Sequence, residues 1–412
     1  MRNVSLTKFK VFTFGLAFIL ALASLLVACT KVSPQIHTRS DVVFGGGIML
    51  EVSAVGGGAE QAIDEIFDVA HELNDSIRLD QDSALRRFNE FTNIDTPFEI
   101  DLHIYTMVQS ILSYYDILGG YFDPRIAPLS KLWNVDIDGI NKYGWFSASQ
   151  PDKLPDQSEI DATIAKYDLD TPFDRAVSIS TSDDKYYMTK NVPSAQLDLG
   201  GIAKGYLADL GGKIAERLDL VSASFNISGD LYVYGDSPAG DPWRISVADP
   251  RPRMTLLGDR GIIAGLELSN SGLTTSGDYE RFYRYQYGVK VNDEVLVQHI
   301  INPKSGTPSG LEWKEDAQRW QNNALAVSSA TVIHPKAIVA EMLSTTLVAA
   351  GLDRAVEISK AILRKDGDAF GVFILEDAYN EIVNTARYAA LGSFEFYNPS
   401  VYNGFMRYNE FR

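Results

Sequence analysis

The chain has 412 residues, of which 45% are hydrophobic and 11% aromatic, and its net charge is −17 at pH 7. This composition predicts a packed globular protein of one large or two ordinary domains. The acidic balance argues against a nucleic-acid partner, because phosphate contacts need clustered lysine and arginine. The single cysteine excludes an intrachain disulfide and a cysteine zinc site.

The first 28 residues have the pattern of a bacterial lipoprotein signal peptide. Three basic residues lie within the first ten positions, an uncharged apolar run follows, and the run ends in L-V-A-C at Cys29. We expect Cys29 to be lipidated as the first mature residue and residues 29–41 to form a tether. A lipid anchor would then hold the protein on the outer face of the bacterial cytoplasmic membrane or in the periplasm. An uncleaved membrane anchor and ordinary signal cleavage are the alternatives.

Residues 42–412 are predicted to form one folded unit of the α+β class. Apolar residues recur with helical spacing in five segments, and strand-like runs lie between them. Segment 153–183 is polar and irregular, and 251–260 and 310–323 look like surface insertions. The predicted helices are 59–77, 102–118, 203–218, 337–350 and 354–364, and the predicted strands are 42–55, 223–227, 231–234, 243–248, 262–268 and 282–289.

The most informative stretch is D-L-G-G-I-A-K-G, residues 198–205. A glycine pair between a carboxylate and a lysine suits a tight strand-to-helix turn that brings bare backbone against a ligand, although such a pair is more often only a turn. It recurs with companions in a fixed order. These are G-G-Y-F-D-P (119–124), N-I-S-G-D (226–230), T-S-G-D-Y-E-R (275–281), H-I-I-N-P-K-S-G (299–306) and A-E-M-L-S-T-T (340–346).

In this order the motifs resemble those of the ApbE family, the FAD:protein FMN transferases, from about residue 44 to residue 350. The resemblance implies an ApbE-like fold of mixed sheets and helices, related to the T-fold, in a single catalytic unit. It also implies a Mg²⁺-dependent reaction with FAD as substrate. FMN would pass to a Thr or Ser hydroxyl of an exported acceptor protein, and AMP would leave.

The resemblance places Mg²⁺ on Glu341, on Thr345 and on the backbone carbonyl of Gly201. The i, i+4 spacing puts Glu341 and Thr345 on one helical face, and Mg²⁺ prefers hard oxygen ligands. Without the resemblance, Glu341 would be read as an exposed carboxylate on an amphipathic helix.

The same resemblance assigns a catalytic role to His299, which would accept the proton of the attacking hydroxyl or orient the phosphates. Only neutral imidazole can accept a proton, and we therefore expect transfer to rise through a pKa near 6 to 7. A hydrogen-bonded structural histidine is the alternative, just as Phe122 could be core and Lys204 a solvated helix-end lysine. The positions assigned to FAD binding are Gly46, Leu79, Tyr121, Phe122, Asp123, Asp198, Lys204 and Ile301.

Several family positions carry other residues here. The usual M-G-T is Gly46-Gly47-Ile48, the usual aromatic residue is Leu79, and the threonine of F-D-x-T is Arg125. The metal aspartate is Glu341, one methylene longer. These changes predict a divergent member, for which a surface FAD-binding (flavin-storage) lipoprotein and an FAD pyrophosphatase are alternative functions.

Overall fold

The computed structural model of the protein describes residues 35–44, 47–144, 147, 149–248, 250, 262–288, 293–323, 326–367, 371–376, 387–392 and 406–407. Contacts within the chain separate residues 1–36 from residues 37–412, and nearly all described residues belong to the second unit. The predicted signal peptide and Cys29 lie outside the described residues. Within the described part, no helix has the length and apolar character that a membrane crossing requires.

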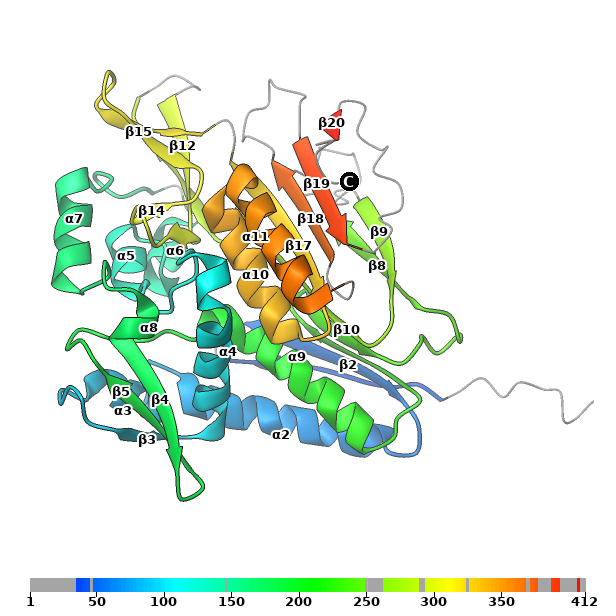
Figure 1. The fold of residues 1–412 in the computed structure, drawn as a ribbon. Helices are drawn as coiled ribbons and strands as arrows, with labels where there is room; N and C mark the ends of the chain where they lie inside the picture. Colours follow the sequence, from blue (N-terminus) through cyan, green and yellow to red (C-terminus); the bar gives the residue numbers. More distant parts are fainter. Residues whose placement is uncertain are drawn as a thin grey trace, which may run out of the picture. The chain divides into compact units, whose positions relative to one another are not determined.

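A nine-stranded sheet is the main β structure of the second unit (Figure 1). Neighbouring strands pair antiparallel, except for the last pair, which is parallel. In spatial order the strands are β1 (His37–Val43), β2 (Ile48–Val55), β6 (Ser222–Ile227), β7 (Asp230–Tyr234), β10 (Ser271–Gly277), β17 (Val327–His334), β18 (Gly371–Glu376), β19 (Arg387–Gly392) and β20 (Met406–Arg407).

Long helices pack against this sheet and enclose the main hydrophobic core (Figure 1). The helix α9 (Gly200–Arg217) contacts β6 and β7, and α10 (Ala337–Ala350) contacts β10, β17 and α9. The helix α2 (Ala59–Ile77) covers β1 and β2, while α4 (Leu102–Leu118) and α11 (Leu352–Asp366) pack against α10. Because α9 and α10 lie side by side, the motifs that they carry meet.

A second, smaller core lies among short elements that follow the first long helices. Its largest buried side chains are Trp133, Trp320, Tyr283 and Tyr285. The remaining helices are α3 (Ala84–Glu90), α5 (Ala127–Leu132), α6 (Ile137–Tyr143), α7 (Gln157–Lys166) and α8 (Phe173–Ala176). The remaining strands are β3 (Phe98–Ile100), β4 (Val177–Ser182), β5 (Lys185–Lys190), β8 (Trp243–Ala248), β9 (Ile262–Leu268), β11 (Phe282–Gln286), β12 (Glu294–Gln298), β13 (Ile301–Asn302), β14 (Thr307–Pro308), β15 (Leu311–Lys314) and β16 (Arg319–Asn322).

The long helices confirm the predictions from apolar spacing. The helices α2, α4 and α10 have the predicted bounds, and α4 ends at Gly119 in the left-handed conformation, with φ 60°. The helix α9 begins at Gly200, three residues before the predicted start. The predicted strand 42–55 is a hairpin of β1 and β2, and β1 includes residues 37–41 of the expected tether.

Two segments differ from their predictions. Segment 153–183, expected to be irregular, contains α7, α8 and β4, and α7 starts with a capping box between Asp156 and Glu159. Segment 310–323, expected to be a surface insertion, forms the hairpin β15–β16, whose Trp320 is 3% exposed. Contacts with the second core hold α7 and the hairpin β15–β16, and contacts with the main core hold α8 and β4, although these elements show little apolar periodicity of their own. The predicted insertion 251–260 lies outside the described residues.

Candidate active site

The last glycine of the 198–205 motif brings α9 against α10. A Cβ atom on Gly205 would lie 2.4 Å from the carbonyl oxygen of Ala337, which is closer than a side chain tolerates. At Gly201 the same atom would lie 3.8 Å from the Phe122 ring, an ordinary contact. Neither glycine has a positive φ. The motif therefore opens a helix and allows a close helix crossing, rather than forming the predicted tight turn after a strand.

Each of these two helices carries a carboxylate that accepts a backbone amide of the other. Asp209 on α9 accepts from Ala337 N at 2.6 Å and from Ile338 N at 3.0 Å, the first amides of α10. Glu341 on α10 accepts from Gly205 N on α9. Ala337 and Ile338 open α10, and helix N-termini leave such amides without helical partners and favour negative charge. These bonds fix α10, and with it Glu341, against α9.

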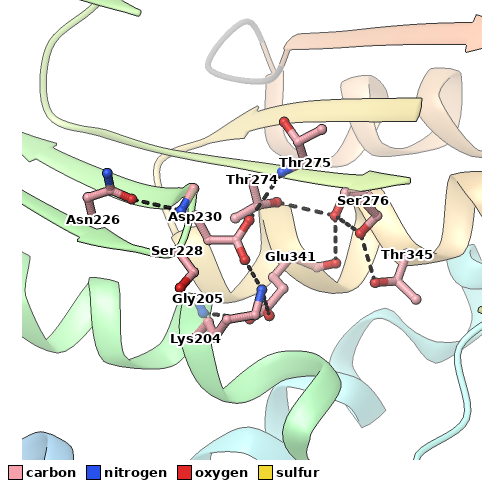
Figure 2. A network of polar contacts seen from close by, with 12 residues as sticks. Lys204, Gly205, Asn226, Ser228, Asp230, Thr274, Thr275, Ser276, Glu341 and Thr345 are labelled. Atoms are coloured by element: carbon pink, nitrogen blue, oxygen red, sulfur yellow. Dashed lines mark hydrogen bonds and ion pairs between the residues drawn. The ribbon is translucent and has the colours of Figure 1, made fainter. Parts of the chain in front are cut away.

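Lys204 lies between two buried carboxylates, Asp230 and Glu341 (Figure 2). Its ammonium pairs with Asp230 and lies 3.0 Å from Glu341 Oε1. Both acids are 3% exposed, and Asp230 also accepts from Thr275 N at 3.2 Å. Buried charges persist only when they are paired and hydrogen-bonded. The three side chains therefore act as one charged unit.

Hydroxyl groups from β10 and α10 form a chain beside this unit (Figure 2). Ser344 Oγ donates its hydrogen to Glu341 O at 2.9 Å. In the 2.8 Å contact between Ser344 Oγ and Ser276 Oγ, Ser276 is therefore the donor. Since each hydroxyl has one hydrogen, the 3.1 Å contact between Ser276 and Thr345 is then donated by Thr345. The lone pairs of Thr345 Oγ1 are consequently available to a further ligand.

The predicted metal donors come from the two facing helices. Glu341 and Thr345 lie one turn apart on α10, and Gly201 lies in the first turn of α9. Carboxylate, hydroxyl and carbonyl oxygens are the donors that hard cations prefer. Among the described residues, no three His, Cys, Asp or Glu side chains gather to hold a metal. A cation here would therefore need the hydroxyl and carbonyl oxygens in addition to Glu341.

The segment after α4 places aromatic rings near the start of α9. Tyr121 is half-buried, and its ring centroid lies 4.6 Å from Lys304 Nζ, a cation–π contact. Phe122 is 6% exposed and belongs to the main core, while its ring faces Gly201. Both readings of Phe122 are thus compatible with its position, because the ring packs in the core beside a predicted metal donor.

Asp123 has a partner that its motif did not predict. Arg125, 1% exposed, donates to Asp123 from Nε at 3.0 Å and from Nη2 at 2.6 Å. The same guanidinium donates to the carbonyl oxygens of Asp168 and Thr171. In this structure, the Asp123 carboxylate is part of a buried, bidentate pair that ties the segment to the loop before α8.

Asp198 lies at the surface where α9 begins. Its Oδ1 accepts from Gly200 N at 2.8 Å, and its own amide donates to Pro124 O at 2.8 Å. The second bond holds the end of the 119–124 motif beside the start of the 198–205 motif.

His299 precedes β13 and is half-buried. Its Nδ1 lies 3.2 Å from the carbonyl oxygen of Arg281, which can only accept, so Nδ1 carries the proton and Nε2 is the basic atom. Burial, and then the charges of Arg281 and Lys204, lower the pKa of His299 to about 3. The imidazole is thus neutral at pH 6 to 7, and the expected titration there is corrected downward.

Other predicted positions lie elsewhere or outside the described part. Leu79 is 39% exposed, as a residue that contacts a ligand can be. Ile301 is 2% exposed and packs in the second core. Gly46 lies outside the described residues.

Two residues of the site were missed by the predictions. Asp230 closes the N-I-S-G-D motif, but its place after a turn, where Ser228 has a φ of 52°, resembles ordinary turn chemistry. Asp209 lies on α9 one turn after Gly205, and its partners come 128 and 129 residues later in the chain. The i, i+4 spacing of Gly205 and Asp209 is a weak signal that both face one neighbour.

The buried cap of α10 predicts a pH-dependent stability. Burial raises the pKa of Asp209 from 3.8 to about 7, although the two amides oppose this shift. Because the folded state then binds the proton more tightly, the free energy of unfolding falls as the pH rises from about 4 to 7. Asp209→Asn should remove this contribution. Relative to the parent, the free energy of unfolding of the variant, measured in urea, should rise by on the order of 2 kcal/mol between pH 5 and pH 8.

The exposed Asp138 offers a matched control. Asp138→Asn makes the same acid-to-amide change at an exposed position, and its stability is measured over the same pH range. A stability difference between Asp209→Asn and the parent that stayed constant from pH 5 to 8 would contradict the raised pKa.

Comparisons with known proteins identify the family and the fold of the chain. The model of the ApbE family matches residues 44–367. The FAD:protein FMN transferase of Haemophilus influenzae is 26% identical over 347 residues, covering 82% of this chain and 88% of that protein. That of Salmonella typhimurium is 27% identical over 373 residues, covering 87% and 94%. The solved flavin transferase ApbE from Vibrio cholerae shares the fold, with a TM-score of 0.61 at 22% identity over 90% of this chain and 98% of that one.

Proposed function

The chain belongs to the ApbE family, and we propose that it transfers FMN from FAD to a Thr or Ser hydroxyl of an exported acceptor protein, releasing AMP. The observation that carries the proposal is the contact of Lys204 with Glu341, which brings the 198–205 and 340–346 motifs together. These two side chains offer a cation for phosphate and an oxygen ligand for a metal in one place, and His299 is a neutral base. The relatives that match this chain over most of their length are named as FAD:protein FMN transferases.

The proposed reaction is a displacement at phosphorus. The acceptor hydroxyl oxygen forms a bond to the phosphorus of the FMN half of FAD, the bond from that phosphorus to the bridging oxygen breaks, and AMP leaves with that oxygen. His299 Nε2 takes the hydroxyl proton, since Nδ1–H is already donated to Arg281 O. Lys204 offers a point charge to the diphosphate oxygens.

A magnesium ion completes the proposal. Glu341, Thr345 and the carbonyl of Gly201 would hold it, and it would offset the negative charge that develops on the phosphoryl oxygens. The lone pairs that Thr345 keeps while donating to Ser276 support this assignment. Glu341, although longer than the usual aspartate, is aligned by the Gly205 amide.

The test is an incubation of the soluble domain with FAD and Mg²⁺, with and without a candidate acceptor. AMP together with a covalently fluorescent acceptor supports FMN transfer. AMP together with free FMN in both samples would instead indicate an FAD pyrophosphatase. Bound FAD without any AMP would indicate a flavin-storage protein and would contradict the proposed reaction.

We further propose that a lipid on Cys29 anchors the mature protein on the outer face of the cytoplasmic membrane or in the periplasm. The support is the L-V-A-C sequence at the end of the apolar run. Such a location would place the enzyme with exported acceptors.

Cys29→Ser should abolish lipidation, because serine lacks the thiol that carries the lipid. We expect loss of palmitate label and of partition into detergent, with either an uncleaved precursor or soluble protein. The parent chain grown in parallel is the control. A membrane-held Cys29→Ser product with the mobility of the mature parent would rule the anchor out.

A further inference from the structure

Asp230 gives the site a second buried negative charge that the three predicted metal donors do not include. Asp230 and Glu341 are each 3% exposed, and Lys204 is the cation that both contact. The unit of these three side chains therefore carries a net charge of −1. In a site largely removed from water, such a charge acts strongly on any ion that approaches.

The hydrogen bond that Asp230 makes does not require this charge. Its Oδ1 accepts from Thr275 N, which links β7 to β10, and an asparagine oxygen could accept the same amide. The other oxygen faces Lys204. The negative charge of Asp230 therefore acts on Lys204 rather than on the sheet.

The charge balance opposes an anionic ligand until a cation arrives. The diphosphate of FAD is anionic and would meet a unit of net charge −1 whose lysine is already held by two carboxylates. A divalent cation bound to Glu341 would change the net charge of the unit to +1. It would also replace Lys204 as the partner of the Glu341 carboxylate. Lys204 can then stay with Asp230 and still offer its exposed side, 23% of the side chain, to a phosphate.

Given the proposed function, on which this step rests, we propose that Asp230 is a positioning residue. It makes binding of the FAD diphosphate depend on prior binding of the divalent cation. Asp230 holds Lys204 at the site when the cation displaces it from Glu341. It also keeps the cation-free site too negative to accept the diphosphate well. Cation and FAD would thus bind in order, with the cation first.

The test measures FAD affinity by flavin fluorescence, with EDTA or with Mg²⁺, in the absence of acceptor. For the parent, Mg²⁺ should tighten FAD binding by about tenfold or more. Riboflavin, which lacks the diphosphate, should bind equally in both buffers. Equal FAD affinity with EDTA and with Mg²⁺ would overturn the proposal without any variant.

Two isosteric variants separate the roles of the two acids. Asp230→Asn should bind FAD several-fold more tightly than the parent in EDTA and should respond less to Mg²⁺. Glu341→Gln should also bind more tightly in EDTA but should lose the Mg²⁺ response, because it removes a donor of the cation. If Asp230→Asn, with the parent melting temperature, bound FAD no better in EDTA, the proposal would be wrong.

FAD affinity and AMP release together distinguish the ordered binding from the proposed function. Equal FAD affinity in both buffers, together with AMP release and a labelled acceptor, would overturn the ordered binding alone. Absence of FAD binding in both buffers would overturn both.

Discussion

Replacing His299 with asparagine should lower FMN transfer by roughly 10²–10⁴-fold, the usual contribution of a general base. The Nδ1–H bond to the Arg281 carbonyl leaves Nε2 as the atom that accepts the proton. Asparagine can keep a donor for Arg281 O but has no comparable base. FAD affinity and melting temperature should stay close to those of the parent.

The pH profile tests the same role. Burial and the charges of Arg281 and Lys204 lower the pKa of His299 to about 3 in the free protein. A plot of kcat/KM against pH should therefore show no change caused by ionisation of His299 between pH 5 and 8. The pH dependence of kcat reports the enzyme–substrate complex. Because the anionic diphosphate stabilises imidazolium, the pKa of His299 in that complex should lie above its pKa in the free protein.

A second histidine in a hydrogen bond serves as the control. His103 lies on α4, outside the charged unit, and its Nδ1 contacts Tyr206 OH of α9 at 3.1 Å. His103→Asn should change stability more than it changes the transfer rate. If His299→Asn lost FAD affinity, stability and transfer in parallel, the residue would be structural and the proposed base would be wrong.

Apolar periodicity was sufficient to predict the elements that form the main core. The helix α2 buries one apolar stripe that recurs in the sequence at helical spacing, whereas α10 is apolar and buried on nearly every face. Segment 153–183 lacked such a stripe. Its helix α7 depends on the cap between Asp156 and Glu159 and on Ile160 in the second core, which are signals of one or two residues each.

The candidate site was predictable where family motifs carry it and not where partners are distant. The resemblance brought Gly201, Glu341 and Thr345 to the same pair of helices. The role of Arg125 depends on carbonyl oxygens 43 and 46 residues later in the chain, which no local pattern reveals. The pKa of His299 depends on burial, a property of the folded protein alone.

Replacing Glu341 with glutamine should lower Mg²⁺-dependent AMP release by at least about tenfold, equivalent to about 1.4 kcal/mol of transition-state energy. Glutamine keeps the shape of the side chain but removes the charge that a hard cation needs. It also presents an amide group to Lys204 and to the Gly205 amide, which the carboxylate now satisfies.

Aspartate at position 341 is the matched control, because it keeps the charge and shortens the side chain by one methylene. Glu341→Asp should retain more AMP release than Glu341→Gln at every Mg²⁺ concentration, and more Mg²⁺ should partly restore the aspartate variant but not the glutamine variant. Manganese binding, followed by electron paramagnetic resonance, should weaken in the same order. Melting temperatures identify any variant that merely unfolds. If a folded Glu341→Gln protein released AMP at the parent rate with the parent Mg²⁺ dependence, Glu341 would not be a metal ligand. In that variant, Asp230 alone would balance the charge of Lys204.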